Sequence, residues 1–138
     1  MTANIFTYGS LMFADVWQRV VCGKYRFAPA QLSGHVRLAV ADETYPGMIA
    51  SAGNQVHGVV YFDVAPDDLE RLDEFEGSEY RRVTLDARVG DAVVPVDTYL
   101  FTAVPRLLEQ EWRPEEFQQQ RFFDTYCRDK LEQVRSAP

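Results

Sequence analysis

Stretches of β-branched and aromatic residues dominate the hydrophobic pattern of this chain, and helical repeats are few. Gly, Pro and Ser separate most of these stretches, as turns between strands require. Elsewhere apolar residues recur every three or four positions, which indicates amphipathic helices. The predicted strands are residues 4–8, 28–32, 35–41, 48–50, 56–64, 80–89 and 92–103, and the predicted helices are residues 13–21, 66–77 and 114–134.

The order of these elements predicts the fold class. Strands do not alternate regularly with helices, and the glycines do not follow a GxGxxG or phosphate-loop spacing, so a doubly wound nucleotide fold is not expected. The pattern predicts an α+β fold with a mainly antiparallel, curled sheet or barrel. Pro95 has no N–H for a sheet ladder, so we expect an edge or a bulge there. With 138 residues, 46% of them hydrophobic, we expect residues 1–138 to form one domain.

The helix predicted over residues 66–77 carries an acid on its apolar side. Leu69, Leu72 and Phe75 mark that side, and Glu76 projects between the first two because it follows them by seven and four residues. Glu74 points the opposite way, toward water. A buried carboxyl group makes a useful base, so Glu76 is a candidate for chemistry. The alternative is a frayed helix end that lets Glu76 turn to solvent.

A second candidate lies where the first strand gives way to the first helix. Tyr8, Gly9, Ser10 and Leu11 follow each other there, and glycine lets the backbone approach a ligand closely. Successive N–H groups in such a turn hold an anionic oxygen. The alternative is an ordinary turn in which Ser10 caps the helix. A nucleophilic Ser10 is poorly supported, because the sequence places no His or Lys base beside it.

Composition and charge exclude several classes of function. The formal net charge is −7, and the basic residues form only short groups flanked by acids, which argues against a nucleic-acid partner. No apolar run reaches the length of a membrane span. The first residues lack a basic region and an apolar signal core, so we expect a cytoplasmic protein.

Cysteine and histidine chemistry is equally unsupported by the sequence. Cys22 and Cys127 are far apart and outside any CxxC pattern, and we expect reduced thiols. His35 and His57 are the two histidines, and nothing pairs either with a cysteine as a catalytic dyad requires. No His or Cys cluster has metal-ligand spacing, so we predict no metal.

Several short motifs follow one another in a specific order. Each is weak alone, but their order and spacing together are specific, and they span nearly all of the chain up to Trp112. The motifs are Phe-Thr-Tyr-Gly-Ser-Leu at 6–11, Tyr-Pro-Gly-Met at 45–48, Gly-Val-Val-Tyr at 58–61, Leu-Asp-Glu-Phe-Glu-Gly at 72–77, Tyr-Arg-Arg at 80–82 and Tyr-Leu-Phe at 99–101.

This series resembles the gamma-glutamylcyclotransferase-like family, and within it the branch of gamma-glutamylamine cyclotransferases and plant avirulence-induced relatives. Leu11 departs from the Ser-Asn continuation of the glutathione-pathway branch. The resemblance implies a small mixed, mainly antiparallel β-barrel flanked by helices. It also implies that Glu76 is the acid/base, and that Tyr8, Gly9, Ser10 and Leu11 bind the substrate.

The activity implied by the resemblance is an intramolecular cyclisation. The α-amine of a γ-glutamyl group attacks its own γ-carbonyl, which releases 5-oxoproline and a free amine without a cofactor. The partner is then a small γ-glutamyl molecule, and no prediction of oligomeric state follows. One alternative is a module that binds such a ligand without turnover. Another is an interaction protein that docks through the aromatic residues of its last helix, although such residues more often form core.

Overall fold

The computed structural model describes residues 1–117 and 119–127 of the chain. Its strands are β1 (Ala3–Thr7), β2 (Phe27–Val40), β3 (Pro46–Val64), β4 (Tyr80–Val89), β5 (Ala92–Phe101) and β6 (Leu107–Glu111). Its α-helices are α1 (Ala14–Val20), α2 (Pro66–Glu76) and α3 (Gln119–Phe122); short 3₁₀ turns occupy Ser10–Met12, Val104–Arg106 and Pro114–Glu116, and a π-helical turn occupies Phe123–Cys127.

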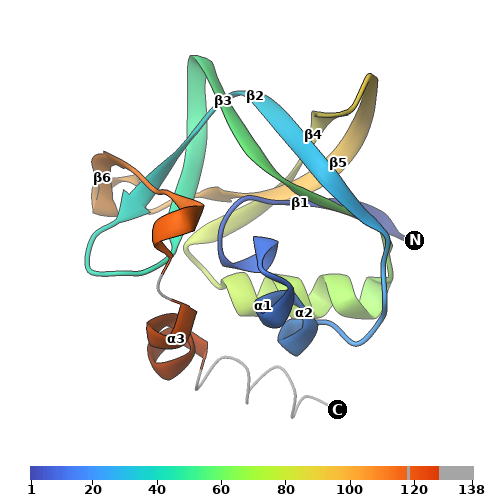
Figure 1. The fold of residues 1–138 in the computed structure, drawn as a ribbon, viewed down its shortest axis with the longest axis horizontal. Coiled ribbons are helices and arrows are strands. Elements are labelled where there is room, and N and C mark those ends of the chain that lie inside the picture. Colours follow the sequence, from blue (N-terminus) through green and yellow to red (C-terminus); the bar gives the residue numbers. More distant parts are fainter. Residues whose placement is uncertain (118, 128–138) are drawn as a thin grey trace.

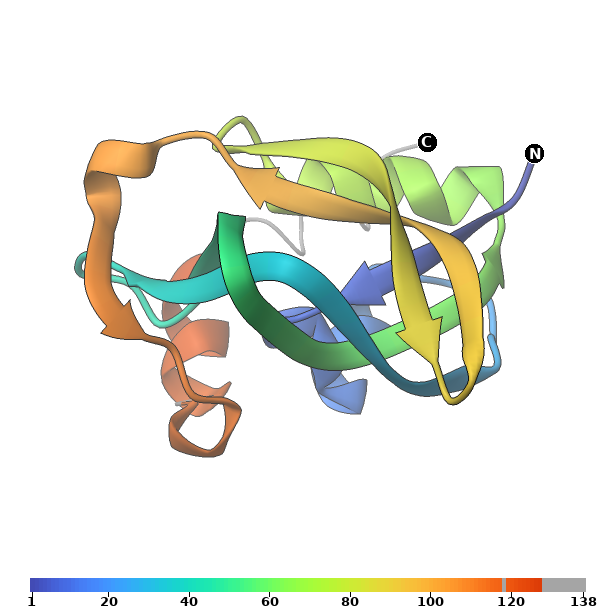
Figure 2. The same ribbon diagram turned by 90° about the horizontal axis from the view of Figure 1, so that it is seen from above.

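Five strands close into a barrel. They follow the order β3-β1-β5-β4-β2, and β2 pairs again with β3 to complete the circle, while β6 extends the sheet along β2. The pairing of β1 with β5 is parallel and the other pairings are antiparallel. Figure 2 shows the strands curling around the barrel. The predicted α+β class with a small mixed barrel and flanking helices is confirmed.

Two strands are much longer than predicted. Residues 27–40 form one strand, β2, because the Ser33-Gly34 step is a register shift within the ladder and not a hairpin turn. Residues 46–64 likewise form one strand, β3, which leaves the β2 register between Ala50 and Gln55 and then rejoins it. Pro95 causes no bulge, because β4 and β5 pair without a shift through Asp86↔Pro95. Strand β6 was not predicted.

The prediction of one long final helix over residues 114–134 is wrong for the described residues of that range. A 3₁₀ turn, a four-residue α-helix and a π-helical turn succeed one another between Pro114 and Cys127. Phe122 is buried, whereas Arg121 and Thr125 are exposed. Residue 118 and residues 128–134 of that predicted helix lie outside the described residues.

The three helices lie on one side of the barrel, below the strands in Figure 1. Leu69, Leu72 and Phe75 bury the inner face of α2 against a core that includes Ile5 and Val64, as the periodicity predicted. A second cluster of apolar side chains fills the barrel itself. Within the described part of the chain, no helix has the length and apolar character needed to cross a membrane.

Candidate functional site

Helix α2 ends at the residue that the sequence analysis singled out. Pro66 begins the helix, and Gly77 ends it in a left-handed conformation with φ of 82°, which glycine adopts without strain. Glu76 is thus the last helical residue, directly after the buried Phe75, and its side chain is half-buried. Glu74 is exposed. The helix end therefore directs one glutamate inward and the other to solvent.

The turn after β1 brings its backbone close to the start of β3. A Cβ atom at Gly9 would lie 2.8 Å from Cδ and 2.9 Å from Cγ of Pro46, so only glycine fits at this approach. Ser10 and Leu11 are buried within the following 3₁₀ turn. The alternative in which Ser10 caps the helix is wrong, because Phe13 is the N-cap residue of α1 and no side-chain capping bond is made there.

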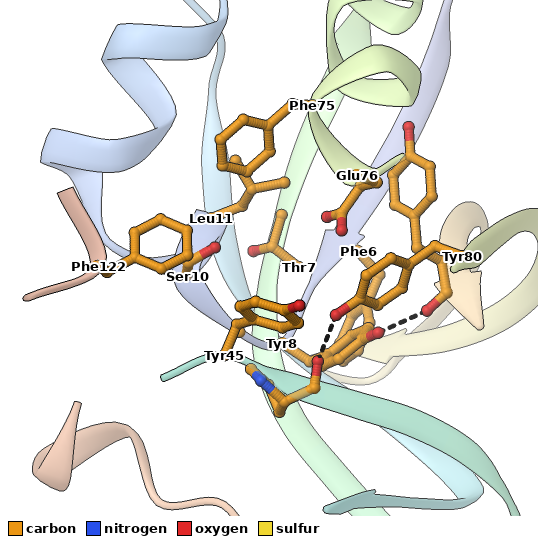
Figure 3. Close-up of a pocket in the computed structure, with 13 residues that line it drawn as sticks. Phe6, Thr7, Tyr8, Ser10, Leu11, Tyr45, Phe75, Glu76, Tyr80 and Phe122 are labelled. Carbon is orange, nitrogen blue, oxygen red and sulfur yellow. Dashed lines mark hydrogen bonds between the residues drawn. The ribbon is translucent and has the colours of Figure 1, made fainter. Parts of the chain in front are cut away.

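The turn and Glu76 line the same cavity, although they are more than sixty residues apart in the sequence (Figure 3). Every residue proposed from the sequence for catalysis or substrate binding therefore lines this one cavity. Other lining residues were not assigned to a site from the sequence, because strand pairing and the packing of the C-terminal segment bring them to the cavity. The full lining is Phe6, Thr7, Tyr8, Gly9, Ser10, Leu11, Tyr45, Pro46, Phe75, Glu76, Tyr80, Tyr99 and Phe122.

Tyrosine hydroxyls hold the wall of this cavity together. Tyr8 donates to the backbone carbonyl of Tyr99 at 2.6 Å, and Tyr80 donates to that of Pro46 at 2.7 Å (Figure 3). The Tyr99 hydroxyl in turn donates to Oδ1 of Asp73 at 2.6 Å. These bonds link the turn after β1 with β3, β4, β5 and α2 around the cavity, so its shape is fixed by several elements at once.

The phenols of Tyr8, Tyr45 and Tyr99 stay protonated at neutral pH. Burial, and next the negative charge of Glu76, raise the pKa of Tyr8 well above its ordinary value. Burial, the hydrogen bond to Asp73 and the charge of Glu76 raise the pKa of Tyr99 in the same way. Burial and the carboxylate of Glu43 raise the pKa of Tyr45 to about 12. Among the described lining residues, only Glu76 has a carboxyl group, which makes it the candidate base.

Other catalytic groups considered from the sequence lie away from this wall. Neither His35 nor His57 is a lining residue, so no histidine of the described chain supports Ser10 as a nucleophile. Cys22 is an exposed free thiol. Arg82 also stays outside the wall, where it pairs with Asp73 at 3.1 Å and Asp97 at 3.3 Å. No group of three His, Cys, Asp or Glu side chains within 1–117 and 119–127 is arranged to hold a metal ion.

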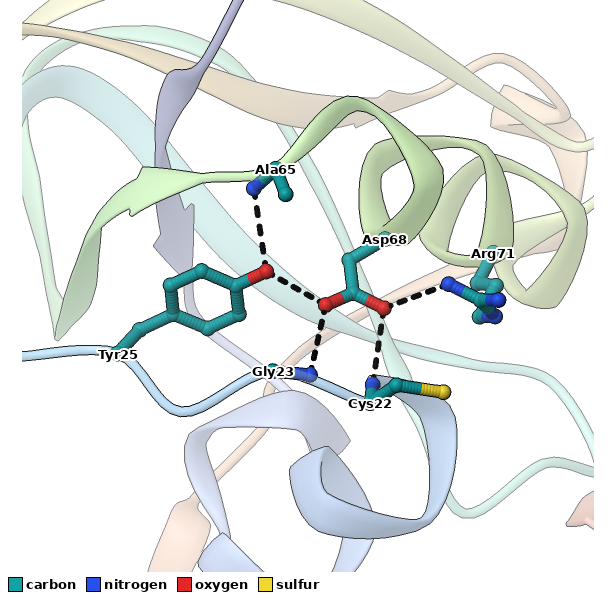
Figure 4. A network of polar contacts seen from close by, with 6 residues as sticks. All are labelled: Cys22, Gly23, Tyr25, Ala65, Asp68 and Arg71. Carbon is teal, nitrogen blue, oxygen red and sulfur yellow. Dashed lines mark hydrogen bonds and ion pairs between the residues drawn. The ribbon is translucent and has the colours of Figure 1, made fainter.

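A second carboxylate on the inner side of α2, Asp68, has a different environment (Figure 4). Its oxygens accept hydrogen bonds from the backbone N–H groups of Cys22 and Gly23, at 2.9 and 3.0 Å, and from the Tyr25 hydroxyl and Arg71. Its contacts show that it ties the segment after α1 to the start of α2.

Comparison with known proteins identifies the family. The model of the family described as gamma-glutamyl cyclotransferase, AIG2-like, matches residues 5–117. AIG2-like protein A of Arabidopsis thaliana is 33% identical over 130 residues, which cover 89% of this chain and 78% of that protein. The solution structure of an Arabidopsis thaliana protein has a TM-score of 0.71 and 31% identity, covering 99% of this chain and 94% of that one.

A more distant structure has the same fold. It is named gamma-glutamyl cyclotransferase and has a TM-score of 0.71 with 16% identity, covering 100% of this chain and 89% of that one. The resemblance read from the sequence motifs is confirmed by the family model and by the curated relative. The chain belongs to the gamma-glutamyl cyclotransferase, AIG2-like family.

Proposed function

We propose that this protein is a cyclotransferase that acts on a γ-glutamyl amine or a γ-glutamyl peptide and releases 5-oxoproline and the free amine. The observation that carries the proposal is the shared cavity of Glu76 and the turn from Tyr8 to Leu11. Family membership supports this reaction class, since the family's name describes it.

The reaction balances within one substrate molecule and its acid/base. The α-amino group arrives mainly as an ammonium, and Glu76 accepts one of its protons. The neutral nitrogen then attacks the γ-carbonyl carbon, which forms the ring C–N bond and a tetrahedral oxyanion. Glu76 gives its proton to the leaving nitrogen, whose bond to the carbon breaks as the oxyanion reforms the carbonyl. The ring nitrogen then loses its second proton through Glu76 to the departing amine, which leaves as an ammonium, so neither an oxidant nor a cofactor is consumed.

The turn after β1 supplies the complementary electrostatics. Gly9, Ser10 and Leu11 all line the cavity, and within the described residues none of their backbone N–H groups donates to a backbone carbonyl. Preorganised N–H groups stabilise an oxyanion most where water is excluded. The neutral phenols of Tyr8 and Tyr99 add no negative charge that would oppose it.

Substrate binding requires a wall of the cavity to move. The cavity volume is about 20 Å³, enough for about one water molecule and too small for a γ-glutamyl group. Phe122 is the wall residue contributed by the C-terminal segment, and it packs edge-on against Phe75 and Tyr45 with ring centroids 6.2 and 6.4 Å away. Displacement of this ring enlarges the site without disturbing the barrel strands.

The direct test is product release. We expect the purified protein to release 5-oxoproline from at least one member of a panel of γ-glutamyl amines and γ-glutamyl dipeptides, quantified by chromatography with mass detection. Calorimetry on the same panel separates the rival function. If a compound of the panel binds and no compound of the panel yields 5-oxoproline, the protein is a binding module and not an enzyme.

A further inference from the structure

Arg37, a residue of β2, reaches from outside the cavity to the backbone of the substrate-binding turn. Its Nη1 atom donates to the carbonyl oxygen of Tyr8 at 2.8 Å and to that of His57 at 3.0 Å. Arg37 itself does not line the cavity, whereas Tyr8 and Gly9 do. The guanidinium group therefore contacts the turn from the side away from the proposed reaction.

The two carbonyl groups lie just beyond the end of the ladder between two strands. The antiparallel pairing of β1 with β3 ends at Thr7↔Val59; Tyr8 follows Thr7 directly, and His57 precedes Val59 by two residues. Arg37 bridges the two carbonyl groups there. A charged donor forms a stronger hydrogen bond than a neutral one, so the bridge holds the Tyr8 carbonyl firmly in one direction.

We propose that Arg37 is a positioning residue that aims the Gly9 N–H at the substrate's γ-carbonyl oxygen. The inference rests on the proposed function and adds a residue to its site. In a trans peptide unit the C=O and the following N–H point in opposite directions. The Tyr8 carbonyl points out of the cavity to Arg37, so the Gly9 N–H of the same unit points into it. The positively charged guanidinium that donates to this carbonyl also polarises the peptide unit and strengthens the Gly9 N–H as a donor.

The surroundings of Arg37 keep its side chain in this one arrangement. Its guanidinium carbon lies 5.4 Å from the ring centroid of Trp112, whose backbone N–H donates to the Arg37 carbonyl at 3.2 Å. Burial lowers the pKa of Arg37, and the carboxylates of Glu111 and Glu115 oppose this effect. An arginine stays charged in such a setting, so the polarisation persists at every pH at which the protein is folded.

The test compares Arg37→Met, which removes the donors, with Arg37→Lys, which restores a cationic donor. Arg113→Met is the matched control, because Arg113 is an exposed arginine nearby. For folded protein, we expect Arg37→Met to lower kcat by about 10- to 100-fold and to change KM much less. Arg37→Lys should recover part of the loss, and Arg113→Met should leave kcat unchanged. A folded Arg37→Met protein with wild-type kcat overturns the proposal, as does an equal loss in the Lys and Met variants.

A measurement that needs no turnover separates this proposal from the proposed function. In ¹⁵N-labelled protein, the Gly9 amide resonance should shift in ligand-free Arg37→Lys, and that of wild type should shift when 5-oxoproline is added. The positioning role is overturned if the Gly9 resonance is unchanged in both experiments. If neither variant folds, the titration of wild type decides whether the Gly9 N–H meets the ligand, as the positioning role requires. Absence of 5-oxoproline release by wild type, with the Gly9 shift in Arg37→Lys present, contradicts the enzyme function and leaves the contact with the turn intact.

Discussion

Asp68 and Glu76 are two carboxylates on the inner side of the same helix, and the fold surrounds them differently. Asp68 is 3% exposed and accepts hydrogen bonds from four groups of the protein. Burial opposes its ionisation, but the bonds from Tyr25, Cys22, Gly23 and Arg71 outweigh burial and lower its pKa. Glu76, at the other end of α2, lines a cavity together with a glycine turn.

The comparison shows that burial alone does not identify a functional acid. A carboxylate whose oxygens are saturated by protein donors is held ionised and serves the fold. A carboxylate that lines a cavity together with a binding turn is placed to meet a substrate. Each carboxylate has a matched control on the same helix: the exposed Glu74 for Glu76 and the exposed Asp67 for Asp68.

The largest expected effect is the loss of turnover in Glu76→Gln. The amide keeps the shape of the side chain but does not accept the ammonium proton, so kcat for 5-oxoproline release should fall by about 10²- to 10⁴-fold. Thermal unfolding should change little. Glu74→Gln removes the same charge from the outer face and should leave kcat near that of wild type. An equal fall in both variants would show a general charge effect and not an acid/base.

The next effect is the loss of stability in Asp68→Ala. Removing the carboxylate leaves two backbone N–H groups and the Tyr25 hydroxyl without their acceptor. We expect the free energy of unfolding to fall by about 3 kcal/mol, measured by urea denaturation. Asp67→Ala should cost less than about 1 kcal/mol, because it loses only the interaction with the helix dipole. Similar costs in the two variants would mean that the Asp68 network contributes little to stability.

A smaller effect is expected at the turn itself. In Gly9→Ala the added Cβ meets Pro46, so the turn moves and kcat/KM should fall by about 10- to 100-fold. Ser10→Ala keeps the backbone N–H groups and removes only the hydroxyl, and should retain kcat/KM within a few-fold. Steady-state kinetics of the two variants checks this. Loss of activity in Ser10→Ala with Gly9→Ala unaffected would instead indicate a role for the hydroxyl.

The smallest effect concerns pH. Because folding lowers the pKa of Asp68 below the ordinary value of 3.8, the unfolded state binds more protons at acidic pH. Its contribution to stability is therefore complete well above that value and is lost as pH falls through the lower, folded pKa. The stability difference between wild type and Asp68→Asn should be constant from about pH 5 to 7 and shrink below about pH 4. A stability difference that grows on acidification would contradict a lowered pKa of Asp68 in the folded state.

Local signals explain what the sequence made predictable. Pro66, Gly77 and the spacing of Leu69, Leu72 and Phe75 lie within one segment, and they define both α2 and the inward side of Glu76. The order of short motifs identified the family, and with it the barrel. Neither inference needed knowledge of long-range pairing.

Features that depend on long-range pairing were not predictable. The Ser33-Gly34 step indicates a turn locally, yet pairing with β3 keeps β2 continuous across it. Tyr45, Tyr99 and Phe122 reach the cavity only because the barrel closes and the C-terminal segment packs below it. Arg37 gives no local signal, since its role depends on two strands that separate beside it.

The most direct measurement for the central claim is a crystal structure with 5-oxoproline bound. The ring should lie between the Glu76 carboxylate and the N–H groups of the Gly9 turn, with hydrogen bonds of about 3 Å to both. A ring bound elsewhere, for example in the larger cavity lined by Trp17 and Tyr25, or one that contacts only one of the two elements, would contradict a single site.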